Sequence, residues 1–335
     1  MIPKADFAKL LPWGVLGLAI FSAASRAEVP PAQAGQLEEI LVTGERPGPG
    51  MWRVSKGGHD LWILATLDPL PKKMLWRSRL VEKRISSSQL VLAPPEVMVD
   101  VSFFNNSGFR HALTQARKDP GGLTLSEELP ADLYLRWQSL RSRYLGNTSY
   151  EHTRPVLAAV DLYEHALDQS GLVSDDHYVW RIVERQARSH HVRIVALTVQ
   201  WHRDRAFDWL REFNGMPREQ EVGCLEKTIN RLETDLEPMR HRANLWSVGD
   251  VEGLRAQSYP DDRIACFNTL FSVFKWDDQL EQAYAGLSDS WLEAVDGALS
   301  KNKSSFAVLP ISGLLKVDGW LAKLRAKGYS VKDPT

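Results

Sequence analysis

Segments with the pattern of β-strands lie near both ends of this chain, and helical patterns fill most of the interval between them. Residues 51–55 and 60–66 flank a short Lys-Gly-Gly-His turn, which predicts a β-hairpin. Further strand patterns occur at residues 89–92, 192–197, 305–309 and 329–331. The sequence therefore predicts an α/β fold, with a central sheet formed by N- and C-terminal ββα-type segments and a large helical insertion between them.

Apolar residues recur at helical spacing through the middle of the chain. Eight of them between Val222 and Trp246 predict one long helix with a single apolar face, kinked at Pro238. Gly249 is expected to end this helix and Asp250 to cap the next one. Another predicted helix is capped by Ser78 and carries Leu80, Val81 and Ile85. A further one has the apolar stripe Leu133, Trp137, Leu140 and Tyr144. Helices are also predicted over residues 156–167, 178–188 and 318–326.

The first 27 residues have the features of a signal peptide. Lys4 and Lys9 precede an apolar run, and small residues at Ser25 and Ala27 suit a signal peptidase. We place the cleavage after Ala27, which predicts a periplasmic or secreted protein. An uncleaved anchor is the alternative, although the run is shorter than the roughly 20 residues of a bilayer span.

Residues 28–50 are rich in Pro, Gly and Glu and predict a flexible leader before a single α/β domain over residues 51–333. Within the leader, the segment from Glu38 to Gly44 resembles the box by which outer-membrane receptors engage the energy-transducing protein TonB. Such a box would add a strand to an open sheet edge of its partner. The alternative is that this segment is only a linker.

Composition and cysteines restrict the possible partners. A content of 44% hydrophobic residues suffices for a sizeable core, and a net charge of -1 predicts no nucleic-acid partner. No segment after the signal peptide is apolar enough to cross a membrane, so the mature chain is expected to be soluble. Cys224 and Cys266 are expected to form a disulfide in an oxidising compartment, and two separate buried cysteines are the alternative.

Several short motifs occur in a characteristic order. They are residues 61–71, Trp76-Arg77-Ser78, residues 90–92, the W-x-x-G-D pattern from Trp246 to Asp250, and residues 314–321 followed by Gly328-Tyr329. This order resembles the TraB/GumN family, which also contains the Tiki metalloproteases, over about residues 51–333. The resemblance implies a divalent-metal site formed by two G-x-x-H motifs and a glutamate, at which a bound water becomes the nucleophile for hydrolysis.

The chain departs from this pattern at every one of those site positions. The residues at the degenerate positions are Ala65 and Asp68 in the first motif, Ala93 in place of the glutamate, and Pro310 and Gly313 in the second motif. Asp68 and Glu96 are the remaining candidates for a metal, and two carboxylates are too few for the usual ligand count. None of the histidines forms a standard metal spacing, and the acids of Asp175-Asp176-His177 are expected to cap a helix.

Two function classes follow from these observations. The first is a non-catalytic envelope protein without a cofactor, which binds an envelope protein, a peptide, a lipid or a glycan at the former cleft. The second is a metal-dependent peptide or amide hydrolase that uses Asp68 and Glu96 as relocated ligands for a divalent metal. Metal binding and hydrolysis discriminate between them.

Overall fold

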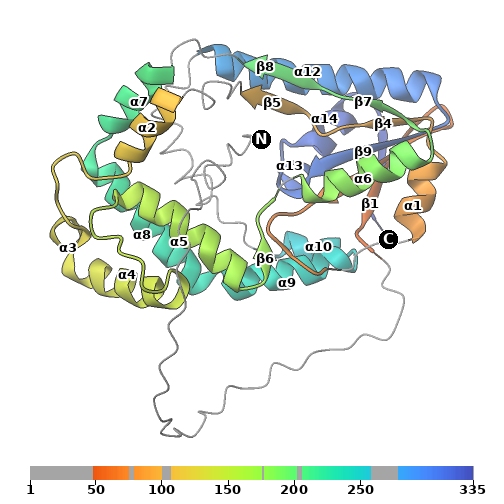
Figure 1. Cartoon of the computed structure of the whole chain (residues 1–335). Helices are drawn as coiled ribbons and strands as arrows, with labels where there is room; N and C mark the ends of the chain where they lie inside the picture. Colours follow the sequence, from red (N-terminus) through yellow and green to blue (C-terminus); the bar gives the residue numbers. More distant parts are fainter. Residues whose placement is uncertain are drawn as a thin grey trace, which may run out of the picture.

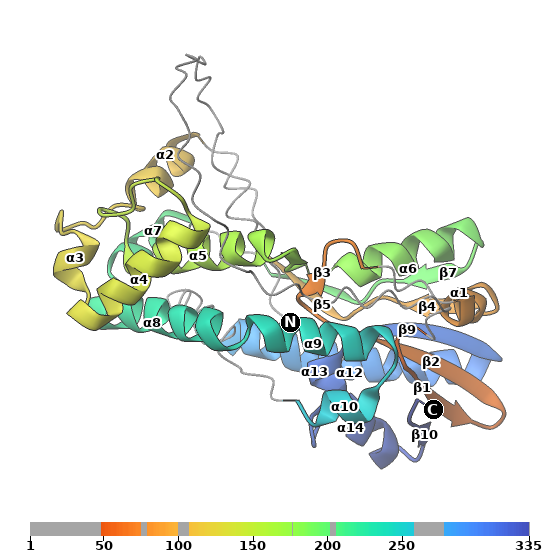
Figure 2. The ribbon, with the colours of Figure 1, turned by 90° about the horizontal axis from the view of Figure 1, so that it is seen from below.

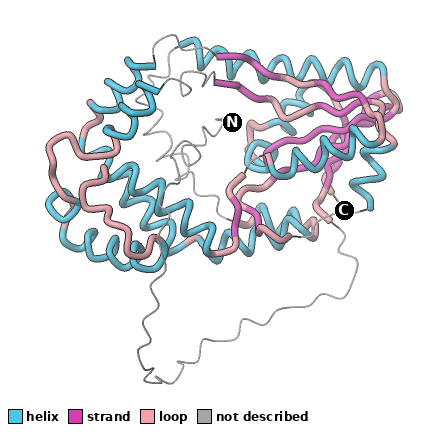
Figure 3. Tube along the Cα trace, in the orientation of Figure 1, coloured by secondary structure: helices cyan, strands magenta, loops and turns pink. Residues whose placement is uncertain are grey.

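The computed structural model describes residues 48–74, 79–99, 107–175, 177–201, 206–257 and 278–334. The chain forms a sheet-containing half and a helical half (Figure 1). Figure 3 shows the main sheet within one half and helices without strands around the far end of the other. The predicted signal peptide, the segment from Glu38 to Gly44, Ser78 and Cys266 lie outside the described residues.

The main sheet has six strands in the order β10-β1-β2-β9-β4-β7. These strands are β10 (Ser330–Lys332), β1 (Met51–Lys56), β2 (His59–Thr66), β9 (Ser304–Pro310), β4 (Leu90–Leu92) and β7 (Arg193–Val195). β1 pairs antiparallel with β2 and with β10, whereas β2, β9, β4 and β7 are parallel to one another. The predicted α/β fold, with a sheet formed from both ends of the chain, is confirmed.

Helices cover both faces of this sheet (Figure 2). α1 (Arg79–Ser86) and α6 (Tyr178–Ser189) contact each other on one face, and α12 (Asp278–Lys301) contacts β2 and β9 from the other. α13 (Ile311–Leu315) and α14 (Trp320–Ala326) follow β9. Val81 and Ile85 of α1 are buried as predicted, but Leu80 is half-exposed, because it lies on the solvent side of that helix.

The helical half has its own hydrophobic core. It is formed by α2 (Ser107–Gln115), α3 (Leu125–Glu128), α4 (Ala131–Tyr144), α5 (Pro155–Gln169), α7 (Ala206–Asn214) and α8 (Arg218–Thr234). The predicted stripe on α4 is buried in this core, and α4 ends before Gly146, which has a φ of 64°. Cys224 of α8 is also buried there. Its bridge to Cys266 stays a prediction.

The prediction of one long helix from Val222 to Trp246 is wrong. α8 ends at Thr234 and α9 (Leu236–Ser247) begins after Asp235, whose carboxylate accepts two 2.8 Å hydrogen bonds from Arg242. The apolar residues of α8 pack in the helical core, whereas Ala243 and Trp246 of α9 pack against the sheet. Pro238 lies in the first turn of α9, where its missing N–H has no intrahelical partner, so the interruption is at Asp235.

Gly249 and Asp250 act as predicted. Gly249 has a φ of 77° and ends α9. The Asp250 carboxylate accepts a 2.7 Å bond from the Gly253 N–H and so caps α10 (Val251–Arg255). A Cβ on Gly249 would lie 3.0 Å from the Gly48 carbonyl oxygen. Residues 48–50, which the sequence analysis assigned to the leader, therefore belong to the packed structure, and Gly48 and Pro49 are buried.

Four short strands were not predicted. β5 (Glu96–Val99) pairs in parallel with β8 (Thr198–Trp201). β5 continues the direction of β4, and β8 that of β7, each after a short irregular segment. Across that segment the Ala93 N–H donates to the Val195 carbonyl at 2.9 Å. β3 (Leu70–Pro71) pairs with β6 (Leu172–Val173). Within the described part of the chain, no helix is long and apolar enough to cross a bilayer.

Candidate functional site

The carboxyl ends of four parallel strands meet at one edge of the main sheet. Thr66 at the end of β2 pairs with Pro310 at the end of β9, and β4 and β7 end beside them. The five degenerate positions lie at or just after these strand ends: Ala65, Asp68, Ala93, Pro310 and Gly313. In open α/β sheets this edge is where ligands and catalytic residues gather.

Ala65 takes part in the packing of the sheet against α9. It is buried, and its carbonyl oxygen accepts a 2.9 Å hydrogen bond from the Trp246 indole N–H. Trp246 belongs to the W-x-x-G-D motif and is itself buried. The motif therefore fixes the end of β2 to the start of the α9–α10 turn.

The Asp68 carboxylate is hydrogen-bonded to the segment before α6. Its carboxylate accepts a 2.8 Å hydrogen bond from the Asp175 N–H and a 3.2 Å bond from the Ser174 hydroxyl. Asp175 in turn accepts a 3.1 Å bond from the His177 N–H and pairs with Arg181. The N-cap of α6 is His177, and it makes no side-chain capping bond. Asp175 therefore does not cap α6 as expected but bonds the N–H of the N-cap residue, and Asp68 holds this segment in place; Asp176 lies outside the described residues.

Gly313 lies directly beneath the Trp320 indole. A Cβ at position 313 would be 2.9 Å from the Trp320 Nε1 and 3.0 Å from its Cδ1. Trp320 cannot easily retreat, because it packs edge-to-face on the fully buried Trp291 with a centroid separation of 4.8 Å. The histidine that the resemblance implied at this position does not fit without displacing both tryptophans.

Replacing Gly313 with alanine is expected to lower the free energy of unfolding by about 1 to 3 kcal/mol, because the added methyl overpacks this contact. The matched control is Gly223→Ala in α8, where a Cβ meets no atom within 4 Å. There alanine should raise stability by up to about 1 kcal/mol through helix propensity. Urea denaturation of both variants measures the difference, and equal effects would contradict the packing assigned to Trp320.

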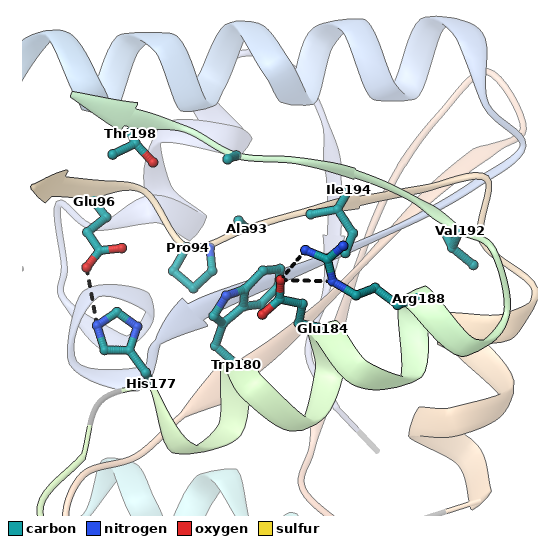
Figure 4. Close-up of a pocket in the computed structure, with 11 residues that line it drawn as sticks. Ala93, Pro94, Glu96, His177, Trp180, Glu184, Arg188, Val192, Ile194 and Thr198 are labelled. Atoms are coloured by element: carbon teal, nitrogen blue, oxygen red, sulfur yellow. Dashed lines mark hydrogen bonds and ion pairs between the residues drawn. The ribbon is translucent and has the colours of Figure 1, made fainter. Parts of the chain in front are cut away.

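Glu96, the second candidate ligand, lies in β5. Its Oε1 is 3.2 Å from the Nε2 of His177 (Figure 4). His177 was not predicted as a partner of Glu96, and no local signal in the sequence indicates this pair, because only the tertiary fold brings β5 to the start of α6. The structure thus places Glu96 beside His177, and Asp68 against Ser174 and Asp175.

A pocket of about 420 Å³ opens beside Glu96, between α6 and the irregular segments that link β4 to β5 and β7 to β8. His177, Trp180, Glu184 and Arg188 line it from one side. The other side is formed by the smaller side chains Ala93, Pro94, Val192, Ile194, Ala196 and Thr198. Ala93, at the former glutamate position, is thus a wall of this pocket.

The residues at the sheet edge do not fit the metal site of the resemblance. Throughout the ranges that the structure describes, no group of three or more His, Cys, Asp and Glu side chains is placed to hold a metal ion. A divalent site needs several such ligands on one ion. What the edge does offer is the pocket, with an aromatic ring, two carboxylates, a guanidinium and an imidazole.

Comparison with known proteins identifies the family of the chain. Neither the curated proteins nor the solved structures contain a match to the chain. The model of the TraB/PrgY/gumN family matches residues 50–333, which is most of the chain and includes every strand and helix described above. The chain therefore belongs to the TraB/PrgY/gumN family.

Proposed function

We propose that this protein is an exported, non-catalytic member of its family that binds a ligand in the pocket between α6 and the β4–β5 and β7–β8 segments. The proposal rests on the contacts made at the degenerate positions. The Ala65 carbonyl bonds to Trp246, the Asp68 carboxylate bonds to the segment before α6, and Gly313 lies under Trp320. An activated water needs a metal or a base held by several groups, and these positions supply only one carboxylate, that of Asp68, which bonds to Ser174 and Asp175.

The structure around the degenerate positions is retained, and this supports a binding function rather than the loss of all function. The sheet, the helix break at Gly249 and the closing loop from Gly313 to Trp320 are intact, and a polar pocket remains at the carboxyl edge of the strands. Pockets of this size with a few polar groups are typical ligand sites. Export rests on the sequence of the first 27 residues, and intact-mass measurement of the mature protein would test cleavage after Ala27.

We expect the purified protein to bind manganese, cobalt or zinc far below one ion per chain and to cleave no member of a peptide library in their presence. Metal content by mass spectrometry and cleavage by chromatography provide the measurements. Hydrolysis that a chelator abolishes would refute the proposal. If Asp68→Ala and Glu96→Ala each abolish such activity, the protein is instead a metal-dependent hydrolase that uses Asp68 and Glu96 as relocated ligands.

Two further proposals concern the rest of the chain. The segment from Glu38 to Gly44 would dock on an envelope partner, and unchanged pull-down partners after deletion of residues 36–46 would remove this idea. A Cys224–Cys266 bridge would tie α8 to the segment before α12. A free-thiol assay on the denatured, non-reduced protein should then detect no thiol.

A further inference from the structure

The face of α6 that borders the pocket has an ordered set of side chains. His177, Trp180, Glu184 and Arg188 follow one another at intervals of three and four residues, so they lie on one side of the helix. The span from the first to the last is about 16 Å along the helix axis. In Figure 4, Trp180 lies between the Glu96–His177 pair and the Glu184–Arg188 pair.

The polar groups of the pocket lie in two pairs. Glu96 lies 3.2 Å from His177, and Glu184 lies 2.7 Å from Arg188. A strongly anionic ligand would meet two carboxylates, Glu96 and Glu184, whereas a neutral ligand is repelled by neither pair. Each pair nevertheless keeps open hydrogen-bonding capacity, because a carboxylate has about four acceptor sites and a guanidinium five N–H donors.

Trp180 supplies the apolar part of the pocket. Its indole is partly exposed and lies near Pro94, opposite the short side chains of the β7–β8 segment (Figure 4). The face of an indole ring carries partial negative charge and attracts the weakly positive C–H groups of a ring laid on it. A large apolar peptide anchor would need a deeper apolar pocket than one bordered by two ion pairs.

These features together match one chemical class. A sugar ring has a C–H face that stacks on tryptophan and a rim of hydroxyl groups that both donate and accept hydrogen bonds. We infer that the pocket binds a short, neutral oligosaccharide, with one ring stacked on Trp180 and its hydroxyls bonded to the two flanking ion pairs. This inference rests on the proposed binding function and names its ligand class.

The test uses the full mature chain on an array of immobilised oligosaccharides and, in parallel, on a peptide array. We expect binding to neutral glycans and not to peptides. For the best glycan, titration calorimetry should show about tenfold or greater weakening in Trp180→Ala, which corresponds to about 1.4 kcal/mol. Glu184→Gln keeps the shape of the side chain and should weaken binding about threefold or more, through loss of a charge-assisted bond.

The control is Glu233→Gln, which changes an exposed pair between Arg136 of α4 and Glu233 of α8, outside the pocket, and should leave binding unchanged. Circular dichroism checks that each variant is folded. Absence of binding to every glycan, or glycan binding that neither Trp180→Ala nor Glu184→Gln weakens, overturns the inference. Peptide binding that Trp180→Ala abolishes also overturns it but leaves the proposed function intact, whereas metal-dependent hydrolysis refutes that function itself.

Discussion

Replacing Glu221 with glutamine lowers the free energy of unfolding by about 3 kcal/mol or more. Glu221 of α8 pairs with Arg154, and the two side chains are only 7% and 1% exposed. The Arg154 Nε donates to both carboxylate oxygens at 3.0 and 3.1 Å, and the guanidinium lies 4.1 Å from the centroid of the Phe213 ring. Without the carboxylate, the guanidinium stays buried with its charge uncompensated, and chemical denaturation measures the loss.

The control is the same substitution elsewhere on α8. Glu233 also pairs with an arginine, Arg136, but these side chains are 37% and 34% exposed, so water already solvates much of both charges. Glu233→Gln should therefore cost less than about 1 kcal/mol. Similar losses for the two variants would show that burial does not set the strength of the Arg154–Glu221 pair.

Glu128 makes the stability of the helical half depend on pH. Its side chain is 2% exposed, and burial, together with the nearby Asp119 carboxylate, raises its pKa to about 7, although Arg218 opposes the shift. Because this pKa is higher than the ordinary 4.5, the folded chain retains a proton that the unfolded chain loses. The stability from this group is present below pH 4.5 and is lost as pH rises toward 7.

We therefore expect the wild-type protein to lose roughly 2 to 3 kcal/mol relative to Glu128→Gln between pH 5 and pH 8. Urea unfolding of both proteins at several pH values gives this difference. Glu127→Gln is the neighbouring control: hydrogen bonds from Thr124 lower the pKa of Glu127, so its carboxylate stays ionised over this range. A constant difference between wild type and Glu128→Gln would contradict the raised pKa.

Local patterns were sufficient to predict the main sheet. The hairpin of β1 and β2, the strands β4 and β9, and the stripe of α4 correspond to the alternation and spacing of their apolar residues. The break at Asp235 was not predictable in this way, because the same helical spacing serves two different cores on either side of it. β5 and β8 are also invisible locally, since each is short and gains its partner only from the fold.

The candidate site, like the fold, was predictable from the sequence only in part. The departure from the ligand pattern that the resemblance implies is a matter of sequence alone, because the strand motifs around Ala65, Ala93 and Gly313 define the positions to compare. What fills those positions could not be predicted in this way. The bond between Asp68 and the Ser174 hydroxyl joins residues 106 positions apart, and the Glu96–His177 pair depends on how α6 lies beside β5.

The position of β9 has a consequence for the order in which the chain folds. β9 lies between β2 and β4, yet it is synthesised after more than two hundred residues that follow them. Until residues 304–310 emerge from the ribosome, β2 and β4 each expose an unpaired edge and cannot join. The nascent polypeptide therefore cannot complete its main sheet before residues 304–310 have been synthesised.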